Sequence, residues 1–115
     1  MSVQFLGTAL DREMALSRVE GDADLLMEIA ALFLGDYPKA LQELHEAVAQ
    51  GDAKHAERAA HGLKGSVANF GARAAVEAAR TIEHMARAEK LADVTPVLEQ
   101  LKEALEALRT ELEKL

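Results

Sequence analysis

Apolar side chains recur along the chain at spacings of three and four residues, the period of an α-helix that is buried along one face. Glycine and proline divide this pattern into segments. The pattern predicts helices over about residues 11–19, between Asp22 and Gly51, from Asp52 to about residue 70, over about 72–88, and from about residue 95 to the C-terminus. Valine and isoleucine are sparse, which argues against a β-sheet.

Polar residues and glycines mark the ends of these helices. An aspartate before an apolar stripe can cap the free N–H groups of a helix, and a glycine after the stripe can end it. We expect starts at Asp11 or Thr8, at Asp22 and at Asp52, and ends at Gly21, Gly51 and Gly71. Pro38 lacks a backbone donor, so we expect a kink or short break there. Thr95-Pro96 is predicted as N-cap and N1 of the last helix, with Asp93 as an earlier start.

The last helix carries a leucine ladder, formed by Leu98, Leu101, Leu105, Leu108, Leu112 and Leu115. Such a ladder is either the core seam of an intramolecular bundle or a dimeric coiled coil. The other helices have matching stripes, which favours the intramolecular seam. Because the connections are short, neighbouring helices should be antiparallel. We therefore expect an all-α single domain over residues 1–115, an up-and-down antiparallel four-helix bundle with a short extra N-terminal helix.

Composition limits the classes of function. The chain of 115 residues has a net charge of −7, which argues against a general nucleic-acid binder, and no cysteine for disulfides or thiolate zinc sites. No apolar stretch approaches the roughly 20 residues that span a bilayer. The N-terminus MSVQFLGTAL lacks a basic region and a long apolar run, so it is not a signal peptide. We expect a cytoplasmic monomer, and the Met start and compact length favour a stand-alone protein.

One face of the third predicted helix is unusual. At about 100° per residue, His61 lies about 160° from Leu63 and points to solvent. The buried face comprises Ala56, Ala59, Ala60, Leu63, Val67 and Phe70. The residues one turn from His61 are Glu57, Arg58, Lys64 and Gly65.

Three features of this exposed face favour a reactive histidine, and the first is that His61 has no partner at a metal-binding spacing. The face also gathers the cations Lys54, Arg58 and Lys64 in an acidic protein, and it has glycines at 62 and 65, each costing about 1 kcal/mol relative to alanine inside a helix. A neutral, exposed imidazole is a nucleophile toward an activated phosphoryl group, and a cation one turn away stabilises the anionic product. The residues alone leave an ordinary interpretation open, because exposed helix histidines often have no function and helix glycines often serve close packing.

The segment HGLKGS from His61, followed by ANFGA from Ala68, resembles the signature of the histidine-containing phosphotransfer (HPt) family. That signature is a phosphoacceptor His, an apolar residue two positions on, then Lys, Gly and often Ser, with Gly-Ala after a short spacer. The likeness covers about residues 11–112 and includes Gly21-Asp22, Phe33 upstream of Pro38, Gly51-Asp52 and Ile82-Glu83. Gly62 is a departure, since the family more often has a small polar residue there.

The resemblance implies a phosphorelay carrier, without a kinase or nucleotide site of its own. His61 would accept a phosphoryl group, on Nε2, from the phospho-aspartate of a receiver domain or from a kinase, and pass it to a response-regulator aspartate. The implied partners are receiver domains and a hybrid sensor histidine kinase. The receiver would supply Mg²⁺, so this chain would need no cofactor, and neither nucleic acid nor membrane is an expected partner.

The resemblance also implies roles for the residues around His61. Lys64 would neutralise the phosphate, Gly65 would clear space for the donor, and Ser66 and Gly71 would shape the helix and its end. No side chain is obviously matched to hold Nδ1 of His61. Glu57, four residues before it, is a candidate, and Arg58 is a candidate for the periphery of the site.

Other candidate sites are weak. His45, His55 and His84 have no metal-binding spacing, so no metal site is expected and these histidines should lie at the surface or its boundary. No Gly-rich nucleotide loop occurs. Met27 and Leu34 lie off the main stripe of the second helix; they either pack beneath the first helix or form a docking patch beside His61.

Two alternatives to a phosphoryl carrier remain. The chain could be a scaffold that binds receivers without passing the phosphoryl group on, although the presence of both His61 and Lys64 argues against this. It could also be a helical dimerisation module built on the leucine ladder.

Overall fold

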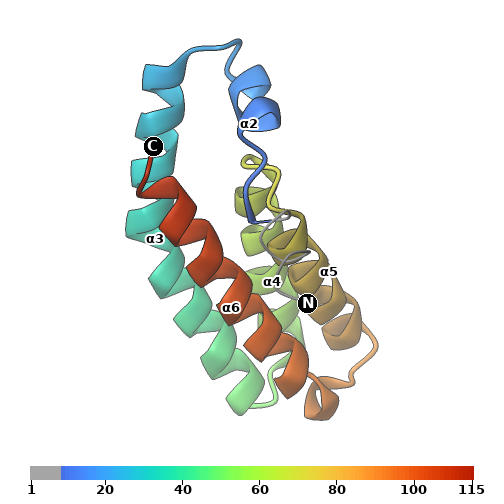
Figure 1. Cartoon of the computed structure of the whole chain (residues 1–115). Coiled ribbons are helices and arrows are strands. Elements are labelled where there is room, and N and C mark those ends of the chain that lie inside the picture. Colours follow the sequence, from blue (N-terminus) through green and yellow to red (C-terminus); the bar gives the residue numbers. More distant parts are fainter. Residues whose placement is uncertain (1–8) are drawn as a thin grey trace.

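The computed structural model describes residues 9–115, and these form helices without any strand (Figure 1). The elements, in chain order, are α2 (Arg12–Arg18), α3 (Ala23–Ala49), α4 (Ala53–Ala68), α5 (Arg73–Arg87), the 3₁₀ turn η1 (Leu91–Asp93) and α6 (Thr95–Leu112). The all-α prediction is confirmed for this part of the chain. Thr8 and most of the N-terminal segment considered as a signal peptide lie outside the described residues.

Aspartate side chains cap three of the helices, as the sequence predicts. Asp11, Asp22 and Asp52 each accept a hydrogen bond from the backbone N–H three residues later, at 3.1, 3.0 and 3.1 Å. These bonds satisfy donors that a helix start leaves free. The short turns that precede α3, α4 and α5 contain Gly21, Gly51 and Gly71, all with positive φ.

Helix α3 is continuous from Ala23 to Ala49, so the expected break at Pro38 is wrong. Proline removes one backbone hydrogen bond, at a cost of about 3 kcal/mol inside a helix. Packing on both sides of Pro38 opposes that cost. Phe33 and Tyr37 are buried and stacked with ring centroids 5.1 Å apart, and Leu44 is fully buried one and a half turns beyond the proline.

The start of α6 also differs from the prediction. Val94 is the N-cap residue, and Thr95 is already helical, so Thr95 is not the cap and Pro96 is not the first helical residue. Val94 is fully buried and has helical φ and ψ of −84° and −16°. Burial of Val94 therefore sets the start of the helix one residue before the polar cap that the sequence favours. Helix α4 ends at Ala68, slightly before the expected residue 70.

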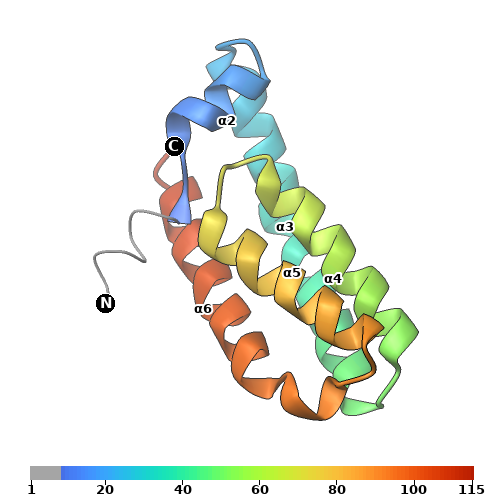
Figure 2. The ribbon, with the colours of Figure 1, turned by 90° about the vertical axis from the view of Figure 1, so that its right-hand side faces the viewer.

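The four long helices lie side by side along one direction, and consecutive ones run in opposite senses (Figures 1 and 2). The turns between α3, α4 and α5 are only three or four residues long, so each helix must fold back on its predecessor. Helix α2 packs near the N-terminal end of α3 (Figure 1). None of the helices within residues 9–115 combines the length and the apolar character needed to cross a bilayer.

The leucine ladder is buried within the chain itself along α6, and only Leu115, beyond the end of the helix, is half-buried. Leu101, Leu105 and Leu108 are fully buried, and Leu98 and Leu112 are at most 4% exposed. The intramolecular interpretation is therefore confirmed, and these leucines do not present an apolar seam to a second copy. Tyr37 adds a polar link between α3 and α6, because its hydroxyl donates to Oε2 of Glu106 at 3.2 Å.

Candidate functional site

Helix α4 presents His61 to solvent because the opposite face of the helix is buried. Ala56, Ala60 and Leu63 are at most 2% exposed, and they fix the rotation of α4 in the core. The side chain of His61 is 68% exposed. The prediction that His61 points away from the core is therefore confirmed.

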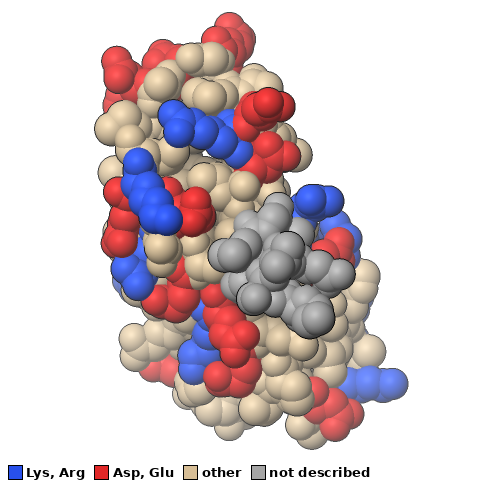
Figure 3. Space-filling view, in the orientation of Figure 1, with Lys and Arg blue, Asp and Glu red and all other residues tan. Residues whose placement is uncertain are grey.

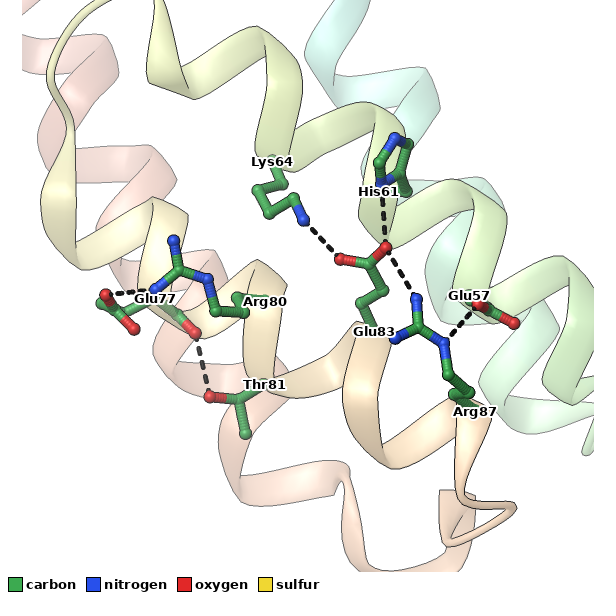
Figure 4. A network of polar contacts seen from close by, with 8 residues as sticks. All are labelled: Glu57, His61, Lys64, Glu77, Arg80, Thr81, Glu83 and Arg87. Carbon is green, nitrogen blue, oxygen red and sulfur yellow. Dashed lines mark hydrogen bonds and ion pairs between the residues drawn. The ribbon is translucent and has the colours of Figure 1, made fainter.

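A buried carboxylate on α5 holds His61 and Lys64 together (Figure 4). The Glu83 side chain is only 5% exposed, and Glu83 is the one buried charged residue in the described part of the chain. Its Oε2 lies 2.8 Å from Nδ1 of His61, and its Oε1 accepts from Nζ of Lys64 at 2.7 Å. The carboxylate thus fixes the two candidate side chains of α4 from the neighbouring helix.

This contact determines the tautomer of His61. The hydrogen bond from Lys64 keeps the pKa of Glu83 below its ordinary value of 4.5, against the opposing effect of burial, so the carboxylate is ionised at neutral pH. An ionised carboxylate only accepts hydrogen bonds, so Nδ1 of His61 must be the donor. In a neutral imidazole the other nitrogen then has no proton. Nε2 therefore carries a free lone pair, and the exposed side of the ring presents a nucleophile.

Replacement of Glu83 by glutamine should destabilise the protein in a pH-dependent manner. We expect the Glu83→Gln variant to lose about 1–3 kcal/mol of unfolding free energy at pH 7, because charged hydrogen bonds are lost. A depressed carboxyl pKa contributes stability that is complete above the unfolded value of 4.5 and is lost as the pH falls through the folded pKa. Urea unfolding at pH 7 and at steps down to pH 3 would measure the difference.

The matched control for this experiment is Glu77→Gln, which removes an exposed carboxylate from the same helix. Glu77 pairs with Arg80 at the surface, and such exposed pairs contribute little. A difference between Glu83→Gln and wild type that stayed constant over the whole pH range would contradict this account of the buried carboxylate.

Glu57 does not contact His61, so its candidate role in holding Nδ1 is wrong. Its Oε2 instead accepts from Nε of Arg87 at 2.9 Å (Figure 4). Arg87 also donates from Nη2 to Oε2 of Glu83 at 3.3 Å. Glu57 therefore orients Arg87, which is a second cation, besides Lys64, on the carboxylate that holds His61.

The structure places the remaining expected residues around this centre. A Cβ added at Gly62 or Gly65 would meet nothing within 4 Å, so neither glycine is required by internal packing. Gly71 has φ +59°, and a Cβ there would lie 2.6 Å from Cβ of Asp11. Ser66 is exposed, and no hydrogen bond of its hydroxyl occurs within residues 9–115. Arg58 is exposed on the His61 side of α4 and forms no ion pair with another described residue.

The other three histidines lie at the surface. His45, His55 and His84 are exposed, as expected. No group of three or more potential metal-ligating side chains (His, Cys, Asp or Glu) occurs among residues 9–115.

Sequence analysis assigned no role to Glu83 or Arg87. A signal for Glu83 exists, because at about 100° per residue it lies about 40° from Ala79 and so falls within the apolar face of its helix. A carboxylate on a buried face requires cationic partners. Arg87 lies four residues away on the same helix, but His61 and Lys64 are 22 and 19 residues away on another helix, so helical spacing does not reveal these two partners.

An apolar groove of about 420 Å³ runs between α3 and α4 beside the histidine. On α4 it is bordered by Gly62, which directly follows His61 in the chain, and by Ser66, one turn further along the helix. On α3 it is bordered by Leu32, which is 67% exposed and is the most exposed large hydrophobic residue described. Neither Met27 nor Leu34 lines this groove; Met27 is 50% exposed and Leu34 packs against the core.

Comparisons with known proteins give the family and the fold that the chain resembles. The Hpt domain family model matches residues 28–111. The crystal structure of histidine-containing phosphotransfer protein B from Pseudomonas aeruginosa PAO1 is similar, with 27% identity, a TM-score of 0.84 and 91% of each chain covered. The HPT domain of a sensor hybrid histidine kinase from Shewanella shares the fold at 18% identity, with a TM-score of 0.82, over 93% of this chain and 92% of that one. No curated protein sequence matches the chain.

Proposed function

The chain belongs to the Hpt domain family and is a histidine phosphotransfer carrier of phosphorelay signalling, and we propose that His61 carries the phosphoryl group. Proteins of this family are phosphocarriers and not kinases, and they work with receiver domains and hybrid kinases. The observation that supports His61 most directly is its contact with Glu83, because in the neutral ring this contact places the proton on Nδ1 and the lone pair on Nε2 of an exposed side chain.

The proposed transfer needs few groups from this chain. The lone pair of Nε2 attacks the phosphorus of a receiver phospho-aspartate, a P–N bond forms, and the P–O bond to the aspartate breaks, with its electrons leaving on the carboxylate. The attack makes the ring cationic, and Glu83 already accepts the Nδ1 proton that bears this charge. Lys64 is 26% exposed, so its ammonium can turn from Glu83 toward the phosphoryl oxygens. The remaining contribution of this chain to the transfer is to hold Nε2 in line with the bond that breaks.

Phosphoryl transfer from a labelled receiver tests this proposal. A receiver domain carrying ³²P-aspartate is mixed with the protein, and a second, unlabelled receiver is then added. We expect acid-labile label that appears on the protein, maps to the peptide containing residue 61, and leaves on the second receiver. Absence of label from a broad panel of receivers, with the protein folded, would favour the scaffold alternative.

We further propose that a docked receiver covers the groove between α3 and α4. Even a transient interface buries several hundred Å² on each partner, far more than one imidazole offers. Gly62, next to His61 in the chain, lines the groove and adds no side chain there. The exposed Leu32 then supplies an apolar contact within the interface.

A bulky side chain at position 65 should block transfer without harming the fold. We expect the Gly65→Gln variant to be as stable as wild type or up to about 1 kcal/mol more stable, because glycine inside a helix is unfavourable. The same side chain would occupy the open space one turn from His61 and slow transfer by about tenfold or more. Thermal unfolding and transfer kinetics measure the two effects.

The control for this prediction is Gly35→Gln, at an open glycine inside α3. It should raise stability in the same way. If Gly65→Gln transferred phosphoryl groups at the wild-type rate, Gly65 would not provide clearance.

The proposal extends to the architecture and the state of the protein. We propose that α3 to α6 form one up-and-down antiparallel four-helix bundle with α2 as the extra N-terminal helix, that residues 1–115 act as one domain, and that the carrier is a cytoplasmic monomer without a nucleotide site. Burial of the leucine ladder within the chain supports the monomer. A sedimentation coefficient that is independent of concentration would test it.

A further inference from the structure

Two carboxylates border the α3 side of the groove. Asp36 and Glu43 both line it, and both are exposed. They lie seven residues apart on one helix face, one on either side of Ala40, which also lines the groove. Neither forms an ion pair within residues 9–115. Lys39 is close to them in sequence but does not line the groove and forms no ion pair there.

The arrangement differs from that of the face around α6, where cations and carboxylates are interspersed (Figure 3). On α6 the charges neutralise one another locally, through Lys102 with Glu99 and through Arg109 with Glu106 and Glu113. Asp36 and Glu43 have no such local partners and keep their charge available to another molecule.

The α4 lining of the groove is uncharged, and two cations lie beyond it on that helix. Lys54 and Arg58 are exposed on α4, seven and three residues before His61, and so lie on the same side of the helix as His61. The groove itself carries the carboxylates on its α3 side, and these two cations lie beyond its uncharged α4 lining, near His61. A docked partner must match both signs at once, and this restricts its orientation.

We propose that Asp36 and Glu43 select the receiver domain by forming an ion pair with one of its basic side chains. That basic side chain lies, on the receiver, next to the apolar residue that contacts Leu32. This inference rests on the proposed function, in which the acidic phosphorylation site of the receiver faces His61. The carboxylates act at the edge of the interface, so they govern recognition and the rate of association and do not take part in the chemical step.

Charge reversal at the edge of the groove tests the inference. The Glu43→Lys and Asp36→Lys variants are compared with Glu103→Lys, which makes the same charge change at an exposed position in a separate depression between α5 and α6. The probe is the phosphorylated receiver that transfers fastest to wild type. We expect the second-order rate constant of transfer to fall about fivefold or more for each groove variant at low salt. The rate at saturating receiver should be unchanged.

Because Asp36 and Glu43 are exposed, we also expect a dependence on salt and a near-normal control variant. The difference from wild type should shrink between 0.1 and 1 M salt, because the Debye length falls from about 10 to about 3 Å. Glu103→Lys should transfer at close to the wild-type rate. An equal fall for Glu103→Lys would show an effect of net charge, and unchanged or faster transfer for the groove variants would overturn the inference.

Binding separates this inference from the proposed function. The same variants are titrated with the unphosphorylated receiver, with calorimetric detection, and unfolding curves confirm that each is folded. If wild type binds receivers but takes no label, the proposed function fails, and the binding of the groove variants still decides whether the carboxylates select the partner. If the groove variants bind the receiver as tightly as wild type, the inference fails. The proposed function still stands in that case, provided that wild type takes up and passes on the label.

Discussion

The His61→Gln variant is expected to take up no phosphoryl group from any receiver that labels the wild-type protein. Glutamine keeps a polar side chain at an exposed position but has no nucleophilic nitrogen, because the lone pair of an amide nitrogen is delocalised. The expected change is a loss of all detectable transfer. The measurement is the time course of acid-labile ³²P on each protein under identical conditions.

A matched histidine variant controls for this result. His84→Gln removes an exposed histidine from α5, a helix that packs against α4, and should be labelled like wild type. Both variants should remain folded, because neither imidazole is part of the core. Label that persisted on His61→Gln would place the phosphoacceptor on another residue and would contradict the role given to the contact with Glu83.

The largest effect on stability is expected for Phe70→Ala. Phe70 is fully buried beyond the end of α4, and its ring meets that of Phe33 edge to face, with centroids 5.3 Å apart. Its loss removes apolar burial and leaves a cavity, at a cost of about 3–5 kcal/mol. Small domains have only about 5–15 kcal/mol of stability, so the variant should unfold at much lower denaturant concentration. Urea unfolding monitored by circular dichroism would measure this.

Leu32→Ala is the control for that experiment. Leu32 is apolar but 67% exposed, so its truncation should change the free energy of unfolding by less than about 0.5 kcal/mol. If Leu32 contacts the receiver, the same variant should bind receivers more weakly. A comparable stability loss in both variants would mean that Leu32 is part of the core, and the proposed docking surface would lose its apolar contact.

The polar network gives the buried carboxylate a part in both stability and transfer. Glu83 is held by His61 and by the two cations Lys64 and Arg87, and His61 and Lys64 lie on α4. Packing of α4 against α5 therefore also sets the tautomer of the proposed nucleophile. A variant that loosens this packing is expected to slow transfer even when it leaves His61 in place.

Much of the local structure follows from the sequence alone, because it depends on residues close together in the chain. The caps at Asp11, Asp22 and Asp52 use bonds to the third residue on, and the outward direction of His61 follows from the apolar residues of its own helix. The candidate residues Lys64 and Gly65 lie within one turn of His61, so helical geometry places them beside it. Such relations require only the helical period.

Tertiary packing decided what the local rules left open or got wrong. Helix α3 continues through Pro38 because buried side chains on both sides oppose the cost of the proline. Glu83, and not Glu57, meets Nδ1 of His61, since the approach of α5 to α4 brings together residues 22 apart in the chain. The groove beside Gly62 likewise exists only between two packed helices. Sequence spacing fixes neighbours within a helix, whereas the energy of burial fixes which helices meet, and at which residues.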